Sequence, residues 1–148
     1  MLDTISKQII TMLQEDGRCS YTAISKRVGL SEPAVRQRVT KLQKEGAIQI
    51  VAVTDPSTMG YSSQAMLGLK VHGPIEELAT RLAQLDEVIY VVFTSGSFDL
   101  LVEVVCKDDT ELIHFVDQNI RCDDAVGAVQ TMRYLGIHRQ DYNWGFIE

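Results

Sequence analysis

Apolar residues recur at helical spacing in three segments near the start of the chain. In order, these residues are Ile5, Ile9, Met12 and Leu13, then Ala23, Ile24 and Val28, then Val35, Val39 and Leu42. Ser20 and Ser31 precede the second and third segments, where a serine hydroxyl caps a helix N-terminus well. Gly17, Gly29 and Gly46 follow the three segments at positions where helices often end. The pattern predicts three short helices.

From residue 48 onward, the helical spacing gives way to apolar alternation and short apolar runs, which are typical of strands. Residues 48–53 are predicted to form a strand, followed by a linker marked by Asp55, Pro56 and Gly60. The elements predicted after the linker are a strand over 65–71, a helix from Pro74 to Leu85, strands over 88–93 and 98–106, a helix beginning at Asp108 or Asp109, and a strand over 126–137. This order matches a ferredoxin-like βαββαβ fold.

The predicted fold class is therefore α+β, with a winged helix-turn-helix followed by a ferredoxin-like domain. We assign residues 1–47 to the helix-turn-helix domain and residues 48–61 to a hinge strand and linker. Residues 62–148 form the second domain.

The strand over 88–93 predicts an interface, because both of its faces are apolar. We expect Val88, Tyr90 and Val92 on one face and Ile89, Val91 and Phe93 on the other. Two helices can cover only one face of a four-stranded sheet, so a second copy of the chain is predicted to pack on the other face. A loop or the C-terminal tail folding over the sheet is the alternative.

The charge is divided unevenly along the 148 residues. The total of −6 argues against nucleic acid, but residues 1–50 hold eight Lys and Arg against five Asp and Glu, a net charge of +3. Residues 51–148 hold six Lys and Arg against fifteen Asp and Glu, a net charge of −9. Only the first part could attract a polyanion. Chance clustering of surface charge would give the same asymmetry.

The helix-turn-helix pattern predicts a DNA-binding surface on the third helix, which a short turn containing Gly29 joins to the second. With the apolar stripe facing inward, the residues predicted to face DNA are Pro33, Arg36, Gln37, Thr40, Lys41 and Lys44, flanked by Glu32 and Arg38. Basic amphipathic helices also occur in many proteins that never touch DNA.

Side-chain chemistry divides these residues into two groups. Arg36 and Gln37 can hydrogen-bond base edges in the major groove. The two lysines and Arg38 suit phosphates, which position the protein without reading sequence. The hydroxyls and backbone amides at Ser20 and Ser31 could also meet phosphates, because helix N-termini favour anions.

Other functional classes find little support. His72, His114 and His138 are scattered, and no Cys-x-x-Cys motif is present, so no metal site is predicted. The glycines form no phosphate-binding loop, and no nucleophile has an evident base, so we expect neither an enzyme nor a cofactor.

The sequence also predicts a cytoplasmic protein without a membrane segment. No apolar run approaches the roughly 20 residues that span a bilayer. The start of the chain lacks the features of a secretory signal. The three cysteines indicate free thiols in a reducing compartment.

The order and spacing of several motifs resemble the Lrp/AsnC, or feast/famine, transcriptional regulators over nearly the whole chain. The motifs that carry the resemblance are Leu2-Asp3 with Ile9-Ile10 and Leu13, Asp16-Gly17-Arg18 with Ser20, the segment Ile24 to Val39, Leu42 with Gly46-Ala47-Ile48, Asp55-Pro56 with Gly60, and Gly96-Ser97-Phe98-Asp99-Leu100. The resemblance implies a dimer, often associating into an octamer, that binds promoter double-stranded DNA and responds to an amino acid. Ser6 and the tail over 140–146 depart from the family pattern, and we expect the tail to pack on a neighbouring subunit.

The same resemblance suggests an effector site in the turn between the second and third strands of the sheet. Gly96 could help to present backbone amides to a carboxylate, and Asp99 could accept from an α-ammonium group. The full set predicted to contact the effector is Tyr90, Thr94, Ser95, Gly96, Ser97, Phe98 and Asp99. A hairpin turn with Asp99 as its cap is the competing interpretation.

The functional prediction is a sequence-specific DNA-binding regulator controlled by a small effector. Two alternatives stay open: an architectural protein of the nucleoid type that wraps DNA with little sequence preference, and an amino-acid-sensing module whose partner is a protein.

Overall fold

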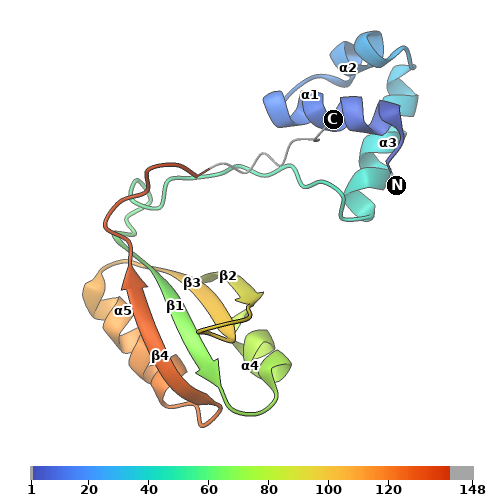
Figure 1. Cartoon of the computed structure of the whole chain (residues 1–148). Coiled ribbons are helices and arrows are strands. Elements are labelled where there is room, and N and C mark those ends of the chain that lie inside the picture. The colour runs from blue at the N-terminus through green and yellow to red at the C-terminus, as the bar shows by residue number, and fades with distance from the viewer. Residues whose placement is uncertain (1, 141–148) are drawn as a thin grey trace. The chain divides into compact units, whose positions relative to one another are not determined.

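The computed structural model describes residues 2–140, which fall into two compact units (Figure 1). The first holds the residues up to Val53, and the second holds Thr54–Arg139. The tail's predicted packing on a neighbouring subunit concerns residues that lie almost entirely outside the described range.

The first unit contains the three predicted helices, α1 (Thr4–Glu15), α2 (Tyr21–Val28) and α3 (Glu32–Lys44). Their shared core is formed by side chains with no exposed surface, namely Ile9, Ile24, Val35 and Val39. Ser20 and Ser31 cap α2 and α3 as predicted, accepting hydrogen bonds from the amides of Ala23 (3.1 Å) and Ala34 (3.4 Å). Gly29 ends α2 with a φ of 71°, in the left-handed region that favours glycine.

The predicted strand over residues 48–53 is not formed, and the helix-turn-helix therefore carries no β wing in the single chain. Ile50, Val51 and Val53 have exposed fractions of 43%, 68% and 60%. A strand requires a neighbour to accept and donate its backbone hydrogen bonds. Among residues 2–140, no segment pairs with these residues, so they form no strand.

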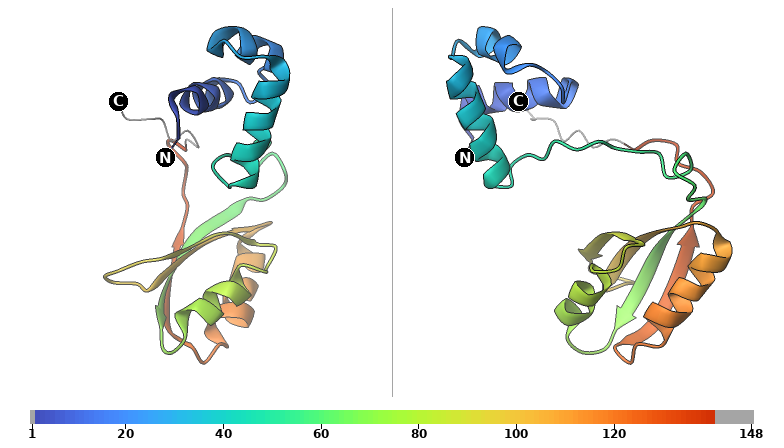
Figure 2. Two further views of the ribbon diagram at one scale, coloured as in Figure 1. Left: turned by 90° about the vertical axis from the view of Figure 1, so that its right-hand side faces the viewer. Right: turned by 180° about the vertical axis from the view of Figure 1, so that it is seen from behind.

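The second unit is a four-stranded antiparallel sheet with helices on one face, as the ferredoxin-like prediction requires (Figure 2). The strand order is β2-β3-β1-β4. The elements are β1 (Ser63–Val71), α4 (Ile75–Leu82), β2 (Val88–Phe93), β3 (Leu100–Cys106), α5 (Asp109–Phe115), the π-helical turn η1 (Val116–Arg121) and β4 (Val126–Arg133). The core lies between the helices and the inward residues of the two central strands.

β1 begins at Ser63 instead of residue 65, and β3 begins at Leu100 instead of residue 98, whereas β2 and β4 differ more from their predicted form. A register shift between Val88 and Tyr90 breaks the alternation of β2, so Val88 and Val91 both pack against the core. The predicted division of this strand into two regular faces was therefore wrong. β4 ends at Arg133 instead of residue 137: its last pair with β1 joins Arg133 to Ala65, and beyond it the Tyr134 amide still donates to the Gln64 carbonyl at 2.8 Å.

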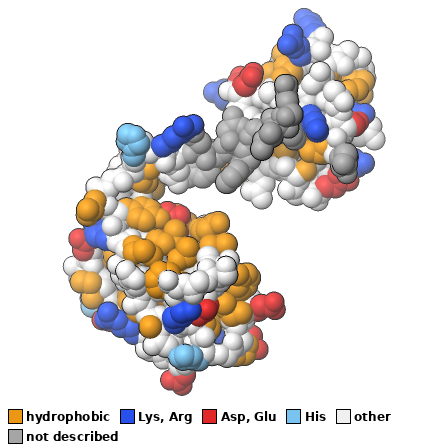
Figure 3. Space-filling view, viewed as in Figure 1, with side chains coloured by type: hydrophobic (Ala, Val, Ile, Leu, Met, Phe, Trp, Pro, Cys, Tyr) orange, Lys and Arg blue, Asp and Glu red, His pale blue; other side chains and the backbone are white. Residues whose placement is uncertain are grey.

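The sheet face away from the helices is partly apolar (Figure 3). Alternation and register place on it Met66 from β1, Leu101 from β3, Val92 from β2 and Met132 from β4. A polar contact lies on the same face, where the Tyr134 hydroxyl donates to the Glu103 carboxylate. Burial, followed by this contact, raises the pKa of Tyr134 to about 12. Within the second unit, Thr54–Arg139, no helix or strand covers this face.

Two glycines on this face provide a test of how tightly it is packed. A Cβ on Gly68 would lie 2.8 Å from ring atoms of the half-buried Phe98, whereas a Cβ on Gly127 would meet the side chain of the exposed His72. We expect Gly68→Ala to lower the free energy of unfolding by about 1–3 kcal/mol, because the Phe98 ring must shift. Gly127→Ala should change it by less than about 0.5 kcal/mol, because His72 can rotate away. Denaturant unfolding at one protein concentration measures both, and equal losses would contradict this packing.

Candidate functional site

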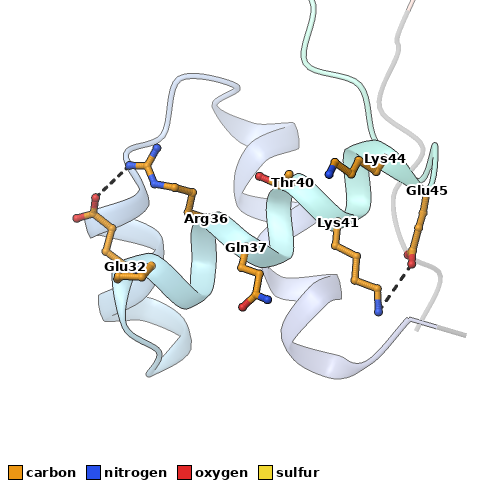
Figure 4. Close-up of a pocket in the computed structure, with 8 residues that line it drawn as sticks. Glu32, Arg36, Gln37, Thr40, Lys41, Lys44 and Glu45 are labelled. Atoms are coloured by element: carbon orange, nitrogen blue, oxygen red, sulfur yellow. Dashed lines mark hydrogen bonds and ion pairs between the residues drawn. The ribbon is translucent and has the colours of Figure 1, made fainter.

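The outer side of α3 presents a continuous row of polar side chains (Figure 4). Val35, Val39 and Leu42 are buried against the other helices, which fixes the opposite side of α3 toward solvent. The residues that line the shallow hollow on that side are Glu32, Pro33, Arg36, Gln37, Thr40, Lys41, Lys44 and Glu45. Seven of the predicted DNA-facing residues are therefore brought together on one surface.

Two of the cations on this surface already have carboxylate partners within the helix. Arg36 lies 3.5 Å from Glu32, and Lys41 lies 3.7 Å from Glu45. Both pairs are largely exposed, and exposed pairs of this kind contribute only about 0–1 kcal/mol. Either cation can therefore exchange its carboxylate for a group on a ligand at little cost.

The first turn of α2 adds two residues that the sequence analysis did not select. The guanidinium carbon of Arg36 lies 5.0 Å from the ring centroid of Tyr21. The Thr22 hydroxyl donates to the second oxygen of Glu32 at 2.8 Å. Helical periodicity on α3 alone could not reveal these contacts, because they depend on how the turn from α2 to α3 folds.

Arg38 lies away from this surface, although we predicted it to contact phosphate. Its guanidinium donates to Asp3 at 2.7 Å and to the Ser6 hydroxyl at 3.2 Å. Asp3 also caps α1 by accepting from the Ser6 amide at 2.7 Å. Hydrogen bonds from Ser6, followed by that from Arg38, hold the pKa of Asp3 well below its usual range. Arg38 therefore connects α3 to the start of α1.

Ser20 and Ser31 are exposed at the N-termini of α2 and α3, where their oxygens accept capping hydrogen bonds. A serine hydroxyl that accepts in this way still has its own proton to donate. Both hydroxyls can therefore still donate a hydrogen bond to a phosphate oxygen, as the prediction requires.

The second predicted site is the hairpin turn between β2 and β3. The backbone of Thr94 donates to the Asp99 carbonyl at 2.9 Å, and its hydroxyl donates to the Phe98 carbonyl at 2.9 Å. Gly96 has a φ of 113°, which a residue with a side chain would rarely adopt. Ser95, Gly96 and Ser97 are exposed at the tip. The turn therefore exists as predicted, held by its own hydrogen bonds.

Asp99 is already engaged in the folded chain. One carboxylate oxygen accepts from the Val71 amide at 2.9 Å, and the other accepts from the Lys70 ammonium at 3.2 Å. The same ammonium donates to the Gly96 carbonyl at 3.1 Å. The Val71 amide, followed by Lys70, lowers the pKa of Asp99. Lys70, which the sequence analysis did not select, thus donates to one oxygen of the carboxylate that we predicted to accept from an effector's ammonium group.

Two other residues predicted to contact the effector lie away from the tip. The ring of Phe98 packs over Gly68 on the sheet face opposite the helices. Tyr90 pairs with Glu103, three register positions before the last pair of the hairpin, Phe93 with Leu100. The turn therefore brings together only part of the predicted set.

Residues 2–140 lack a metal-binding cluster and a membrane-spanning helix. No group of three His, Cys, Asp or Glu side chains is placed to hold a metal ion. No helix in this range is long and apolar enough to cross a membrane.

Both units match known protein families. Residues 2–43 match the AsnC-type helix-turn-helix domain, and residues 62–147 match the PF0864 C-terminal dimeric alpha+beta barrel domain. The HTH-type transcriptional regulator FL11 of Pyrococcus horikoshii is 37% identical over 141 residues, which cover 94% of this chain and 93% of the relative.

Solved structures share the fold. Escherichia coli AsnC has a TM-score of 0.79 at 23% identity and covers 95% of this chain and 96% of its own. The transcriptional regulator NMB0573 of Neisseria meningitidis, in complex with L-Met, has a TM-score of 0.83 at 24% identity, with coverages of 96% and 95%. These matches confirm the predicted fold class. The chain belongs to the AsnC/Lrp family of HTH-type transcriptional regulators.

Proposed function

We propose that α3 lies in the major groove of double-stranded DNA, where Arg36 and Gln37 contact base edges. The observation that carries this proposal is the exposed polar row on α3, which the buried Val35, Val39 and Leu42 hold in one orientation. Arginine and glutamine form bidentate hydrogen bonds to guanine and adenine, each worth about 1–3 kcal/mol of discrimination. The protein is then a regulator that selects its sites by sequence.

Lys41, Lys44 and Thr40 lie further along the same row and suit the phosphates beside the groove. The exposed hydroxyls of Ser20 and Ser31 add donors at two helix N-termini. These contacts release counterions, so affinity should fall steeply as salt rises. The net charge of +3 over residues 1–50 supports this assignment.

We further propose that two copies pair through the uncovered sheet face and present two α3 helices to one DNA site. The dimeric description of the matched C-terminal domain supports the pairing. Two related helices should contact half-sites about one helical turn apart, or a multiple of it. Higher assembly, up to an octamer, and action in the cytoplasm belong to the same proposal.

Replacing Arg36 and Lys41 separately tests the division between base reading and phosphate binding. Arg36→Ala should reduce affinity for a duplex selected from a random library by about tenfold and leave affinity for a scrambled duplex nearly unchanged. Lys41→Ala should weaken both duplexes equally, by about two- to fivefold, because phosphates carry no sequence information. Fluorescence anisotropy at fixed salt measures all four constants.

The same comparison of selected and scrambled duplexes also discriminates between a sequence-specific regulator, an architectural DNA-binding protein and a module with a protein partner. Equal losses on both duplexes for both variants would contradict base reading by Arg36. Wild-type protein that binds selected and scrambled duplexes equally would instead indicate an architectural DNA-binding protein. Absence of duplex binding at low salt would indicate a protein partner.

The turn between β2 and β3 is our proposed effector site, with an amino acid as its ligand. The complex of NMB0573 with L-Met, a regulator of the same fold, supports this class of ligand. In this chain, the Lys70 ammonium holds the Asp99 carboxylate and the Gly96 carbonyl. The ammonium group of an amino acid therefore competes with this internal cation for Asp99 and gains less from the contact than it would from a free carboxylate.

Lys70→Met should tighten amino-acid binding by up to about fivefold, because the exposed pair it removes is worth about 0–1 kcal/mol. Lys70→Arg keeps a cation beside Asp99 and should bind like the wild-type protein. Calorimetry with each of the twenty L-amino acids provides the measurement. Binding that is identical in all three proteins would remove Lys70 from the site, and absence of binding in all three would overturn the effector proposal itself.

A further inference from the structure

The N-terminal end of α3 carries a connected group of four side chains that the assignment of base and phosphate contacts does not explain. Two of them, Glu32 and Arg36, lie one turn apart on α3. The other two, Tyr21 and Thr22, begin α2. The group therefore joins the two helices of the helix-turn-helix on the side that we assign to DNA.

Each side chain of the group contacts the next, in an order that begins at Thr22 and ends at Tyr21. The Thr22 hydroxyl donates to one oxygen of Glu32 at 2.8 Å, and the other oxygen of Glu32 lies 3.5 Å from the Arg36 guanidinium. The guanidinium in turn lies over the Tyr21 ring, 5.0 Å from its centroid. Arg36 nevertheless keeps 64% of its side chain exposed. The side chain is thus held on two sides and open to a ligand on the rest.

We propose that Tyr21 and Glu32 are positioning residues that set the base preference of Arg36, a role that rests on the DNA contact proposed for this arginine. The Tyr21 ring restricts the guanidinium by cation–π attraction. Glu32, held in place by Thr22, orients the guanidinium edge by an ion pair. An arginine arranged before DNA arrives loses less side-chain freedom when it forms a bidentate pair with guanine.

The two contacts differ in what happens on docking. Glu32 contacts a single terminal nitrogen of the guanidinium, at 3.5 Å, and a guanine that uses this nitrogen in a bidentate pair replaces that contact. The Tyr21 contact uses the face of the guanidinium and leaves its edge free, so it persists in the complex. Tyr21 therefore acts on the specific complex, whereas Glu32 acts on the competition with other anions.

Glu32 also makes the Arg36 guanidinium a less favourable partner for phosphate. A carboxylate beside Arg36 repels a phosphate that would otherwise take the arginine as a simple counterion. This repulsion raises the difference between specific and non-specific binding, because it weakens the contact that carries no sequence information. The acidic residue on a DNA-facing surface is then a source of specificity.

The test uses the full-length protein and duplexes selected from a random library by the wild type. Arg36→Ala first identifies the base pair at which its preference is lost. At that position, the ratio of affinities for the preferred and substituted duplexes is then measured for Tyr21→Leu, with Tyr21→Phe as its matched control. This ratio does not depend on the active fraction, so a partial loss of folding does not change it.

We expect Tyr21→Leu to lower the ratio about two- to fivefold, the range of an exposed cation–π contact, and Tyr21→Phe to keep it because the ring face remains. Glu32→Gln should raise affinity for a scrambled duplex about two- to threefold at low salt, and the gain should disappear at high salt. An unchanged ratio in Tyr21→Leu, with a clear loss in Arg36→Ala, overturns the proposal alone. If Arg36→Ala shows no base-specific loss, the base-reading assignment also fails.

Discussion

The burial of one side of α3 is the constraint on which the functional surface depends. Val35 and Val39 have no exposed area, and they share a small core with Ile9 and Ile24. A helix anchored in this way can present only one side to a ligand. The buried contacts therefore decide which side chains of α3 are exposed in the polar row that we propose to face DNA.

A similar dependence appears in the second unit, where residues on two strands determine what the hairpin turn can do. Gly68 leaves space for the Phe98 ring, and the Val71 amide fixes the Asp99 carboxylate. Lys70 of β1 completes this arrangement, because its ammonium group donates to the Asp99 carboxylate and to the Gly96 carbonyl. The turn is therefore held by its own contacts in the free chain, and Lys70 already donates to one oxygen of the Asp99 carboxylate.

The local pattern of residues along the sequence was sufficient to predict most of the helices and strands, and it predicted part of the residues that the structure brings together at each candidate site. The serine caps, the left-handed Gly29 and the apolar stripes act within a few residues, so the sequence predicted α1 to α3 closely. The strand over 48–53 failed because pairing needs a partner that periodicity does not supply. The bulge in β2 and the contacts of Tyr21, Arg38 and Lys70 depend on how distant segments meet, which spacing along the chain does not encode.

Methylation interference tests the placement of α3 most directly, because a methyl group on guanine N7 blocks the major groove and one on adenine N3 blocks the minor groove. With duplexes selected by the wild-type protein, the account predicts interference at N7 of guanines that recur about one helical turn apart, or at a multiple of it. Interference confined to adenine N3, or its absence at every guanine, would contradict the account.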